Sequence, residues 1–344
     1  ILEMLMAGSV ISKYWGVYLN DFMRLMGWNA NTNLTFGSFH IDIAPIIIVA
    51  FFTTLLVFGT KIGARVDGAM TVLKIAIVFF VVIVGFFYVK ASNFTPFIPP
   101  SQPASTVEGS SAVTGVMTQP LWQFATGMTP SVYGVPGILS GAALVFFAFI
   151  GFDVVATASE ETKNPHKNVP LGIGVGMLLI IVMYMLVAVV TTGMVSYADL
   201  AKQDSPSLAT AFELVGADWA AKIISFGIVL GLATVVMVLL LGLTRIVFAM
   251  SRDGLLPRGL SKTGKHGTPA ALQIVVGAVV ALVAAFFDIG VLSDMVNIGT
   301  LSAFTLVAIS IPIMRKKRPD LPRAFKMPGS PWIPIPVSYT HLRA

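Results

Sequence analysis

Residues 170–195 read PLGIGVGMLLIIVMYMLVAVVTTGMV and contain no charged side chain. A bilayer core of about 30 Å needs about 20 apolar residues in a helix, so this stretch predicts a membrane-spanning helix. The composition agrees, because 56% of the 344 residues are hydrophobic and only 11% are charged. Soluble globular domains carry about 25% charged residues, and disordered chains combine high charge with low hydrophobicity, so both classes are excluded.

Similar apolar runs recur along the chain. Their lengths and their Gly, Ala, Leu and Val content favour helices over the short alternating strands of a membrane barrel. We expect about eight spans, the first of them truncated: 1–19, 41–59, 68–89, 137–157, 170–195, 221–249, 269–287 and 292–314. The predicted fold class is all-α, a polytopic membrane protein.

Lysine and arginine gather in alternate connections between the runs, which predicts the orientation of the chain. Basic residues mark cytoplasmic loops. The connections after the second, fourth, sixth and eighth runs are therefore expected inside, and the first run crosses outward. The basic residues of these four inside connections are Lys61, Arg65, Lys163, Lys167, Arg252, Arg258, Lys262, Lys265 and the cluster 315–326. The net charge of +6 thus reflects membrane orientation and does not indicate nucleic-acid binding.

Ionisable residues inside a span cost roughly 2.5–3.5 kcal/mol at the helix centre, and they often mark function. The sequence offers Glu3, Lys74, Asp153, Arg245 and Asp294. Lys74 lies about six residues inside its run, roughly 9 Å at 1.5 Å per residue, so it either snorkels to the surface or has a functional role. Asp153 is either a structural carboxylate or a functional one, and Arg245 and Asp294 are expected at the interfaces.

The fourth run contains a candidate helix interruption. Gly151 stands between aromatic residues in FFAFIGFD, residues 146–153. Transporters often break a helix at mid-membrane so that freed backbone groups bind the substrate. One glycine is weak evidence alone, because membrane helices contain many.

Four stretches carry a family resemblance: FFAFIGFDVVATASEETKNPHKNVP at 146–170, TRIVFAMSRDGLLP at 244–257, VNIGTLSAFTLV at 296–307 and RKKRPDLPRAFKMP at 315–328. Together they resemble the amino acid permeases of the amino acid–polyamine–organocation superfamily, and within it the bacterial cationic amino acid transporter branch. The resemblance covers nearly all of residues 1–336.

The resemblance implies a partial LeuT-type fold with two inverted repeats. The runs correspond to part of the family's third helix and to its helices 4 to 10. Residues 1–336 are then a single transmembrane permease domain, with the second repeat at about 137–314. Helices 1, 2, 11 and 12 are expected to be missing from this fragment. Residues 337–344, VSYTHLRA, back-translate into a common sequencing-adapter read and are set aside as a scar.

The resemblance also implies which residues bind the substrate. The backbone carbonyls of Phe147, Ala148 and Ile150, beside Gly151, are expected to accept hydrogen bonds from the substrate ammonium. Phe152 is expected to cover the site as an aromatic gate.

Three further residues follow from the resemblance. Lys74 matches a lysine that, in proton-coupled members, takes the place of the sodium ion of sodium-coupled ones. Burial changes the proton affinity of a lysine, so proton coupling fits its chemistry. Glu3 matches a glutamate near the pocket, and Leu232 matches a pocket-lining position that limits substrate size.

The expected function is secondary active transport of amino acids by alternating access, coupled to protons, in the plasma membrane of a bacterium. An amine, polyamine or amino acid exchanger on the same fold stays open, and so does a channel or a non-transporting membrane protein. The sequence contains no cysteine, and its four histidines are scattered, so thiolate and histidine-rich metal sites are not expected. With no nucleophile–base pair or phosphate loop either, no enzymatic activity and no cofactor are expected. The expected partners are the amino acid, protons and the lipid bilayer.

Overall fold

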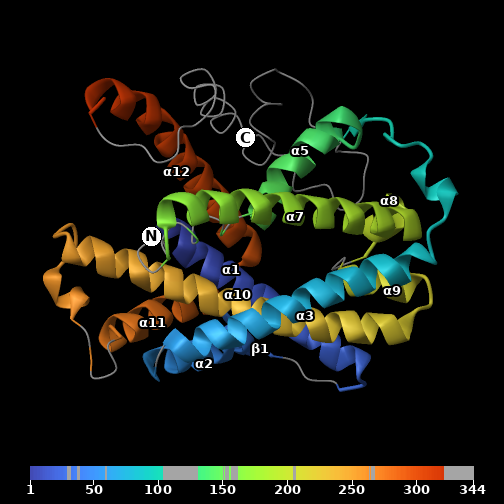
Figure 1. Cartoon of the computed structure of the whole chain (residues 1–344). Coiled ribbons are helices and arrows are strands. Elements are labelled where there is room, and N and C mark those ends of the chain that lie inside the picture. Colours follow the sequence, from blue (N-terminus) through green and yellow to red (C-terminus); the bar gives the residue numbers. More distant parts are fainter. Residues whose placement is uncertain are drawn as a thin grey trace. The chain divides into compact units, whose positions relative to one another are not determined.

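The computed structural model describes residues 1–28, 32–36, 39–58, 60–103, 131–149, 151, 155, 162–203, 207–262, 264 and 268–320. The chain divides into two compact units. Unit 1 comprises Ile1–Val89, Val182–Val195 and Ser205–Val296, and unit 2 comprises Lys90–Ile181, Ser196–Asp204 and Asn297–Ala344. Figure 1 shows the labelled helices and strands, coloured from blue at the N-terminus to red towards the C-terminus.

Unit 1 is built from helices and one small hairpin. The elements that lie wholly within it are α1 (Leu2–Leu25), β1 (Asn33–Phe36), β2 (Phe39–Asp42), α2 (Ile43–Phe58), α3 (Thr60–Phe86), α9 (Leu208–Leu214), α10 (Asp218–Arg252), η6 (Arg258–Ser261) and α11 (Ala270–Phe286). Two long helices cross the boundary between the units: α7 (Pro165–Met194) and α12 (Ile289–Lys317).

Unit 2 holds the remaining described elements. These are η1 (Ala91–Phe94), β3 (Gln102–Pro103), β4 (Ser131–Val132), α5 (Gly134–Phe146), η4 (Phe147–Phe149) and α8 (Tyr197–Ala201), with the first part of α7 and the last part of α12. The strand β3 pairs antiparallel with β4, and the rings of Tyr133 and Tyr197 lie 5.1 Å apart. The side chain of Ser196 caps α8 by accepting a hydrogen bond from the backbone N–H of Asp199.

Each of the eight predicted runs overlaps an α-helix of at least 13 residues, so the all-α prediction is confirmed. The helices often extend past the apolar runs: α1 continues to Leu25, and α10 includes the polar residues Asp218 and Arg252. Helix propagation needs only backbone hydrogen bonds, so polar residues at a span's end continue the helix into the headgroup region. Among the described residues, α7, α10, α12 and Gly68–Phe86 of α3 are long and apolar enough to cross a membrane, while α2 and α11 are shorter apolar helices.

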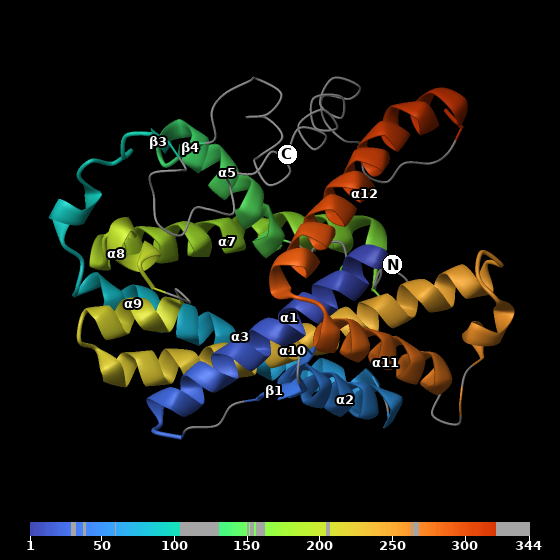
Figure 2. The same ribbon diagram turned by 180° about the vertical axis from the view of Figure 1, so that it is seen from behind.

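Helix α10 is the core of unit 1. It packs against α1, α2, α3, α9 and α11, and Figure 2 shows α1 running across it. More than half of the apolar window of α10, 56%, is buried, against 11% for α3. Leu240, Leu243 and Val236 are fully enclosed there. In lipid the hydrophobic effect does not drive helices together, so this close packing supplies the stability.

Small residues let the helices of unit 1 approach closely. A Cβ on Gly8 of α1 would lie 3.6 Å from Val280 of α11, and one on Gly16 would lie 2.9 Å from Ala44 of α2. A Cβ on Gly277 would lie only 2.1 Å from Oγ1 of Thr53. At these glycines a side chain of the neighbouring helix rests on bare backbone, which brings α11, α1 and α2 close together, as is common between membrane helices.

The hairpin between α1 and α2 is a feature that the predicted runs did not include. Strands β1 and β2 pair antiparallel, with Asn33 opposite Asp42 and Phe36 opposite Phe39. The backbone N–H of Ile43, the first residue of α2, donates to the carbonyl of Thr32. The hairpin therefore places Asp42 directly at the N-terminus of α2.

Candidate functional site

The predicted interruption of the fourth run is present in unit 2. Regular α-helix ends at Phe146, and the tighter 3-10 turn η4 follows over Phe147–Phe149. Gly151 then adopts a φ of +116°, a backbone conformation that residues with a Cβ rarely adopt. The break begins at Phe147, within the stretch 146–153 where the interruption was expected. At the end of a regular helix the last carbonyls can accept hydrogen bonds from partners outside the α-helical pattern.

The candidate ammonium-binding residues lie at this break. Phe147 and Ala148 belong to η4, Ala148 is exposed, and Gly151 is half-buried. Ile150 and Phe152 lie outside the described residues, as does Asp153. The carbonyl roles of Phe147, Ala148 and Ile150 and the gating role of Phe152 therefore stay predictions.

Lys74 lies in unit 1, where α3 packs against α10. A Cβ placed on Gly231 of α10 would lie 3.5 Å from Cγ and 3.7 Å from Cε of Lys74. The aliphatic stem of Lys74 thus runs over the bare backbone of Gly231, and the side chain is half-buried. A lysine that lay on the lipid-facing side of α3 would not contact α10, so this contact favours a position within the helix bundle.

A second side chain of α3 contacts the same face of α10, at Gly227, one turn before Gly231. A Cβ on Gly227 would lie 2.6 Å from Cδ1 of Ile77, and Ile77 follows Lys74 by one helical turn. Residues three or four apart lie on one helix face. Gly227 and Gly231 therefore form a groove on α10 that holds Ile77 and Lys74 in register.

Glu3 and Leu232 also belong to unit 1. Glu3 is in the first turn of α1 and is half-buried, and Leu232 is half-buried and follows Gly231 on α10. The structure therefore brings Lys74 to the helix that carries Leu232. Phe147, Ala148 and Gly151 belong to unit 2. The roles of Glu3 and Leu232 stay predictions.

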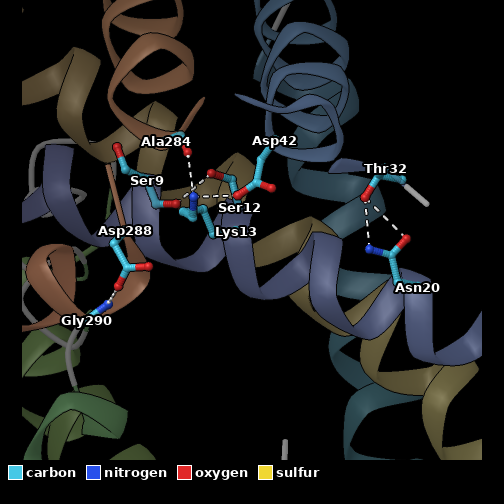
Figure 3. Close-up of polar contacts among 9 residues, drawn as sticks. All are labelled: Ser9, Ser12, Lys13, Asn20, Thr32, Asp42, Ala284, Asp288 and Gly290. Carbon is cyan, nitrogen blue, oxygen red and sulfur yellow. Dashed lines mark hydrogen bonds and ion pairs between the residues drawn. The ribbon is translucent and has the colours of Figure 1, made fainter. Parts of the chain in front are cut away.

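A charged residue that the sequence analysis did not single out is buried in unit 1. Lys13 of α1 is only 8% exposed, although it lies in the first apolar run. Its Nζ donates a hydrogen bond of 3.2 Å to the carbonyl of Ala284 and forms an ion pair with the carboxylate of Asp42 (Figure 3). An isolated buried ammonium is costly, and this carboxylate and carbonyl compensate it.

Three helix ends converge at Lys13. Ala284 lies in the last turn of α11, where carbonyls lack intrahelical partners and a cation is favourable. Asp42 precedes α2, and Asp288 precedes α12 and accepts a hydrogen bond of 2.8 Å from the backbone N–H of Gly290. Carboxylates are favourable at helix N-termini for the same electrostatic reason.

Lys13, Asp42 and Asp288 line a cavity of about 470 Å³ within unit 1, which we call the Lys13 cavity. Its polar lining is Lys13, Asn20, Thr32, Asp42 and Asp288, and its apolar lining includes Val17, Pro45, Phe286, Phe287 and Ile289. Asn20 and Thr32 are joined by a hydrogen bond of 2.9 Å, which Figure 3 shows beside the Lys13–Asp42 pair. Opposite charges and an apolar wall therefore share one cavity.

The sequence contained a signal for Lys13. A charge inside an apolar run is the criterion that identified Lys74, and Lys13 meets it. Ser9, Ser12 and Gly16 share its face of α1, and this small, polar stripe indicates a helix contact rather than lipid. The partner Asp42 could not be inferred from the runs, because the pairing depends on the hairpin and on the packing of α11.

Comparisons with known proteins assign the family. The model of the family described as amino acid permease matches residues 5–341. The branched-chain amino acid permease BcaP of Bacillus subtilis (strain 168) is 39% identical over 97% of this chain and 66% of the relative. The methylthioribose transporter of the same organism is 35% identical over 97% of the chain and 66% of the relative.

A plant relative shows how widely the similarity extends. The vacuolar cationic amino acid transporter 4 of Arabidopsis thaliana is 34% identical over 81% of this chain and 42% of the relative. The chain spans about two thirds of the length of the two bacterial relatives. Together with its long apolar helices, these matches make it a multi-pass membrane protein. The chain belongs to the amino acid permease family.

Proposed function

We propose that the complete protein transports amino acids across the plasma membrane of a bacterium by alternating access. The match to the family model over residues 5–341 carries this proposal. In it, residues 1–336 form one permease domain, and about 137–314 form its second repeat. The interrupted helix at Phe147–Phe149 supports it, because transporter substrates bind at such breaks.

The substrate ammonium is bound at the break by backbone carbonyls. Phe147, Ala148 and Ile150 supply them, and Phe152 closes over the bound molecule. The end of α5 at Phe146 and the positive φ of Gly151 support this assignment, since both mark an interruption of the regular helix at these residues. Carbonyl oxygens suit an ammonium group, which has three N–H donors and no acceptor.

Lys74 couples transport to protons. A lysine in a helix bundle is easier to bury when neutral and easier to hydrate when charged, so its proton affinity follows the wetting of its surroundings. The contact of its stem with Gly231 supports this role, because it holds the side chain against α10. Alternation between outward- and inward-open states then changes the hydration of Lys74 and moves a proton with each cycle.

Glu3 and Leu232 tune the substrate site. Glu3 contributes a carboxylate near the ammonium, and Leu232 limits the size of the substrate side chain. Two relatives named for amino acids support an amino acid as substrate. Another similar relative is named for a substrate that is not an amino acid, methylthioribose, so the substrate class needs a direct test.

Uptake by the complete gene product in proteoliposomes tests the proposal. We expect accumulation of labelled amino acids when a pH gradient, acidic outside, is imposed, and competition among branched-chain and cationic amino acids identifies the preferred class. Methylthioribose and putrescine serve as comparison substrates. Uptake of either one without uptake of any amino acid would overturn the proposal. Efflux that needs an amino acid on the opposite side would favour an exchanger over a symporter.

A further inference from the structure

The Lys13 cavity has a composition that neither the helix packing nor the proposed transport site explains. It lies wholly within unit 1 and contains one buried ammonium and two carboxylates. The pair of Lys13 and Asp42 is mutually neutral, and Asp288 adds one negative charge. A purely structural ion pair at a helix junction would need only the first two groups, and no cavity.

The position of the cavity makes it accessible from one side of the membrane. It lies where α11 ends and where α2 and α12 begin, beside Asn20 of α1. The connections at these points contain few lysines and arginines, and the positive-inside rule places such connections outside the cell. Asp288 is exposed at this end, whereas Lys13 is buried, so the charge on the cavity floor differs from that on its rim.

The ligand chemistry follows from the lining. The contacts described for Lys13 use two of the three N–H groups of its ammonium, so a third can donate to an incoming carboxylate. Each carboxylate of the cavity can accept several hydrogen bonds, and Asp288 uses one oxygen for Gly290. Val17, Pro45, Phe286 and Ile289 supply an apolar wall. The volume of about 470 Å³ falls in the range of small-molecule sites.

We propose that the Lys13 cavity is an extracellular binding site for a zwitterionic amino acid with an apolar side chain. The ammonium of Lys13 receives the ligand carboxylate, the carboxylates of Asp288 and Asp42 receive the ligand ammonium, and the apolar wall receives the side chain. The site shares no residue with the helix break in unit 2 and raises the local concentration of ligand at the outer surface. It requires only residues of unit 1, so this chain can bind ligand whether or not it transports.

The test is equilibrium binding of labelled L-leucine to the purified chain in lipid nanodiscs. We expect saturable binding of leucine. Two analogues should compete with it at least about tenfold more weakly than unlabelled leucine does: 4-methylpentanoate, which lacks the ammonium, and leucinamide, which lacks the carboxylate. Asp288→Asn should weaken leucine binding by about threefold to tenfold, because one charge-assisted contact is lost. Asp199→Asn, an exposed carboxylate on α8, is the matched control and should leave the affinity unchanged.

A second variant protects the test against misfolding. Lys13→Met alone leaves Asp42 buried without its cation, whereas the double variant Lys13→Met/Asp42→Asn removes both charges together. We expect the double variant to keep the helical circular dichroism and elution volume of the wild type and to lose leucine binding.

Each other outcome overturns the proposal in a distinct way. Unchanged leucine affinity in both Asp288→Asn and the folded double variant would place the binding elsewhere in the chain. Binding of putrescine but not of leucine would make the cavity a cation site. Absence of leucine binding up to millimolar concentrations would leave the cavity without this ligand. None of these results bears on transport, which the uptake assay on the complete gene product measures separately.

Discussion

Replacing Gly227 with alanine tests how closely α3 and α10 pack. A Cβ at Gly227 would lie 2.6, 2.7 and 3.1 Å from Cδ1, Cγ1 and Cγ2 of Ile77. Carbon atoms pack at about 3.5–4.0 Å, so the two helices must separate locally or Ile77 must leave its rotamer. Overpacking of this kind costs about 1–3 kcal/mol. We therefore expect Gly227→Ala to weaken the α3–α10 contact that positions Lys74.

Gly231→Ala is the matched control on the same helix. Its Cβ would lie 3.5 Å from the nearest atom of Lys74, which is an ordinary contact. Both substitutions gain the same helix propensity, up to about 1 kcal/mol for glycine to alanine. The difference in stability between the two variants therefore isolates the steric cost at Gly227, about 1–3 kcal/mol.

The assay is the apparent midpoint of thermal unfolding in detergent, followed by circular dichroism at a fixed heating rate. A loss of 1 kcal/mol lowers this midpoint by about 2–4 °C in domains of 150–250 residues, so Gly227→Ala should melt several degrees below Gly231→Ala. Ile77→Ala removes all three clashing atoms, and in that background Gly227→Ala should have no steric cost. Equal midpoints for Gly227→Ala and Gly231→Ala would refute this packing argument.

Two further predictions concern the other glycine contacts and the short helix α8. Gly277→Ala should lower the apparent midpoint of unfolding, because its Cβ would meet Thr53 at 2.1 Å. The control Gly174→Ala should not lower it, since no described atom lies within 4 Å of that Cβ. Equal losses of midpoint in the two variants would contradict this reasoning. Two contacts hold the pKa of Asp199 below its usual value. The larger effect comes from the hydrogen bond that the Ser196 hydroxyl donates, and the next from the hydrogen bond and positive charge of Lys202. This contribution to α8 stability is therefore present above the unfolded pKa and is lost as pH falls through the folded pKa. Ser196→Ala should raise the pKa of Asp199 in NMR titrations, and an unchanged pKa would count against the contact.

The helices could be predicted from the sequence because apolar length is a sufficient signal in a membrane. Runs such as 170–195 need no knowledge of their partners to be recognised as spans. The interruption near Gly151 was also predictable, since a glycine between aromatic residues weakens a helix locally and the family resemblance places the break there.

The Lys13 cavity could not be predicted in the same way. Its walls come from α1, α2, α11 and α12, and only their packing brings Lys13 to Asp42 and Ala284. The hairpin that places Asp42 did have a sequence signal, because Gly37 and Ser38 separate two short runs. Partner choice, in contrast, depends on small residues such as Gly16 and Gly277, whose role appears only when the neighbouring helices are known.

The contact of Lys74 with Gly231 shows the same limit for the proposed coupling site. The sequence identified Lys74 as an expensive charge, but it left snorkelling open as an alternative. The structure favours the bundle because the lysine stem lies on α10. Only the packing of α3 on α10 distinguishes these two positions.

The measurement that tests the central claim most directly is uptake driven by a pH gradient in proteoliposomes of the complete gene product with Lys74→Ala. We predict that the variant loses uphill accumulation of its amino acid, while substrate binding partly survives, because the proton-linked group is gone and the helix break remains. Glu3→Gln should change the affinity more than the coupling. Accumulation by Lys74→Ala at the wild-type level would contradict the account, since Lys74 would then be only a half-buried lysine that plays no part in proton movement.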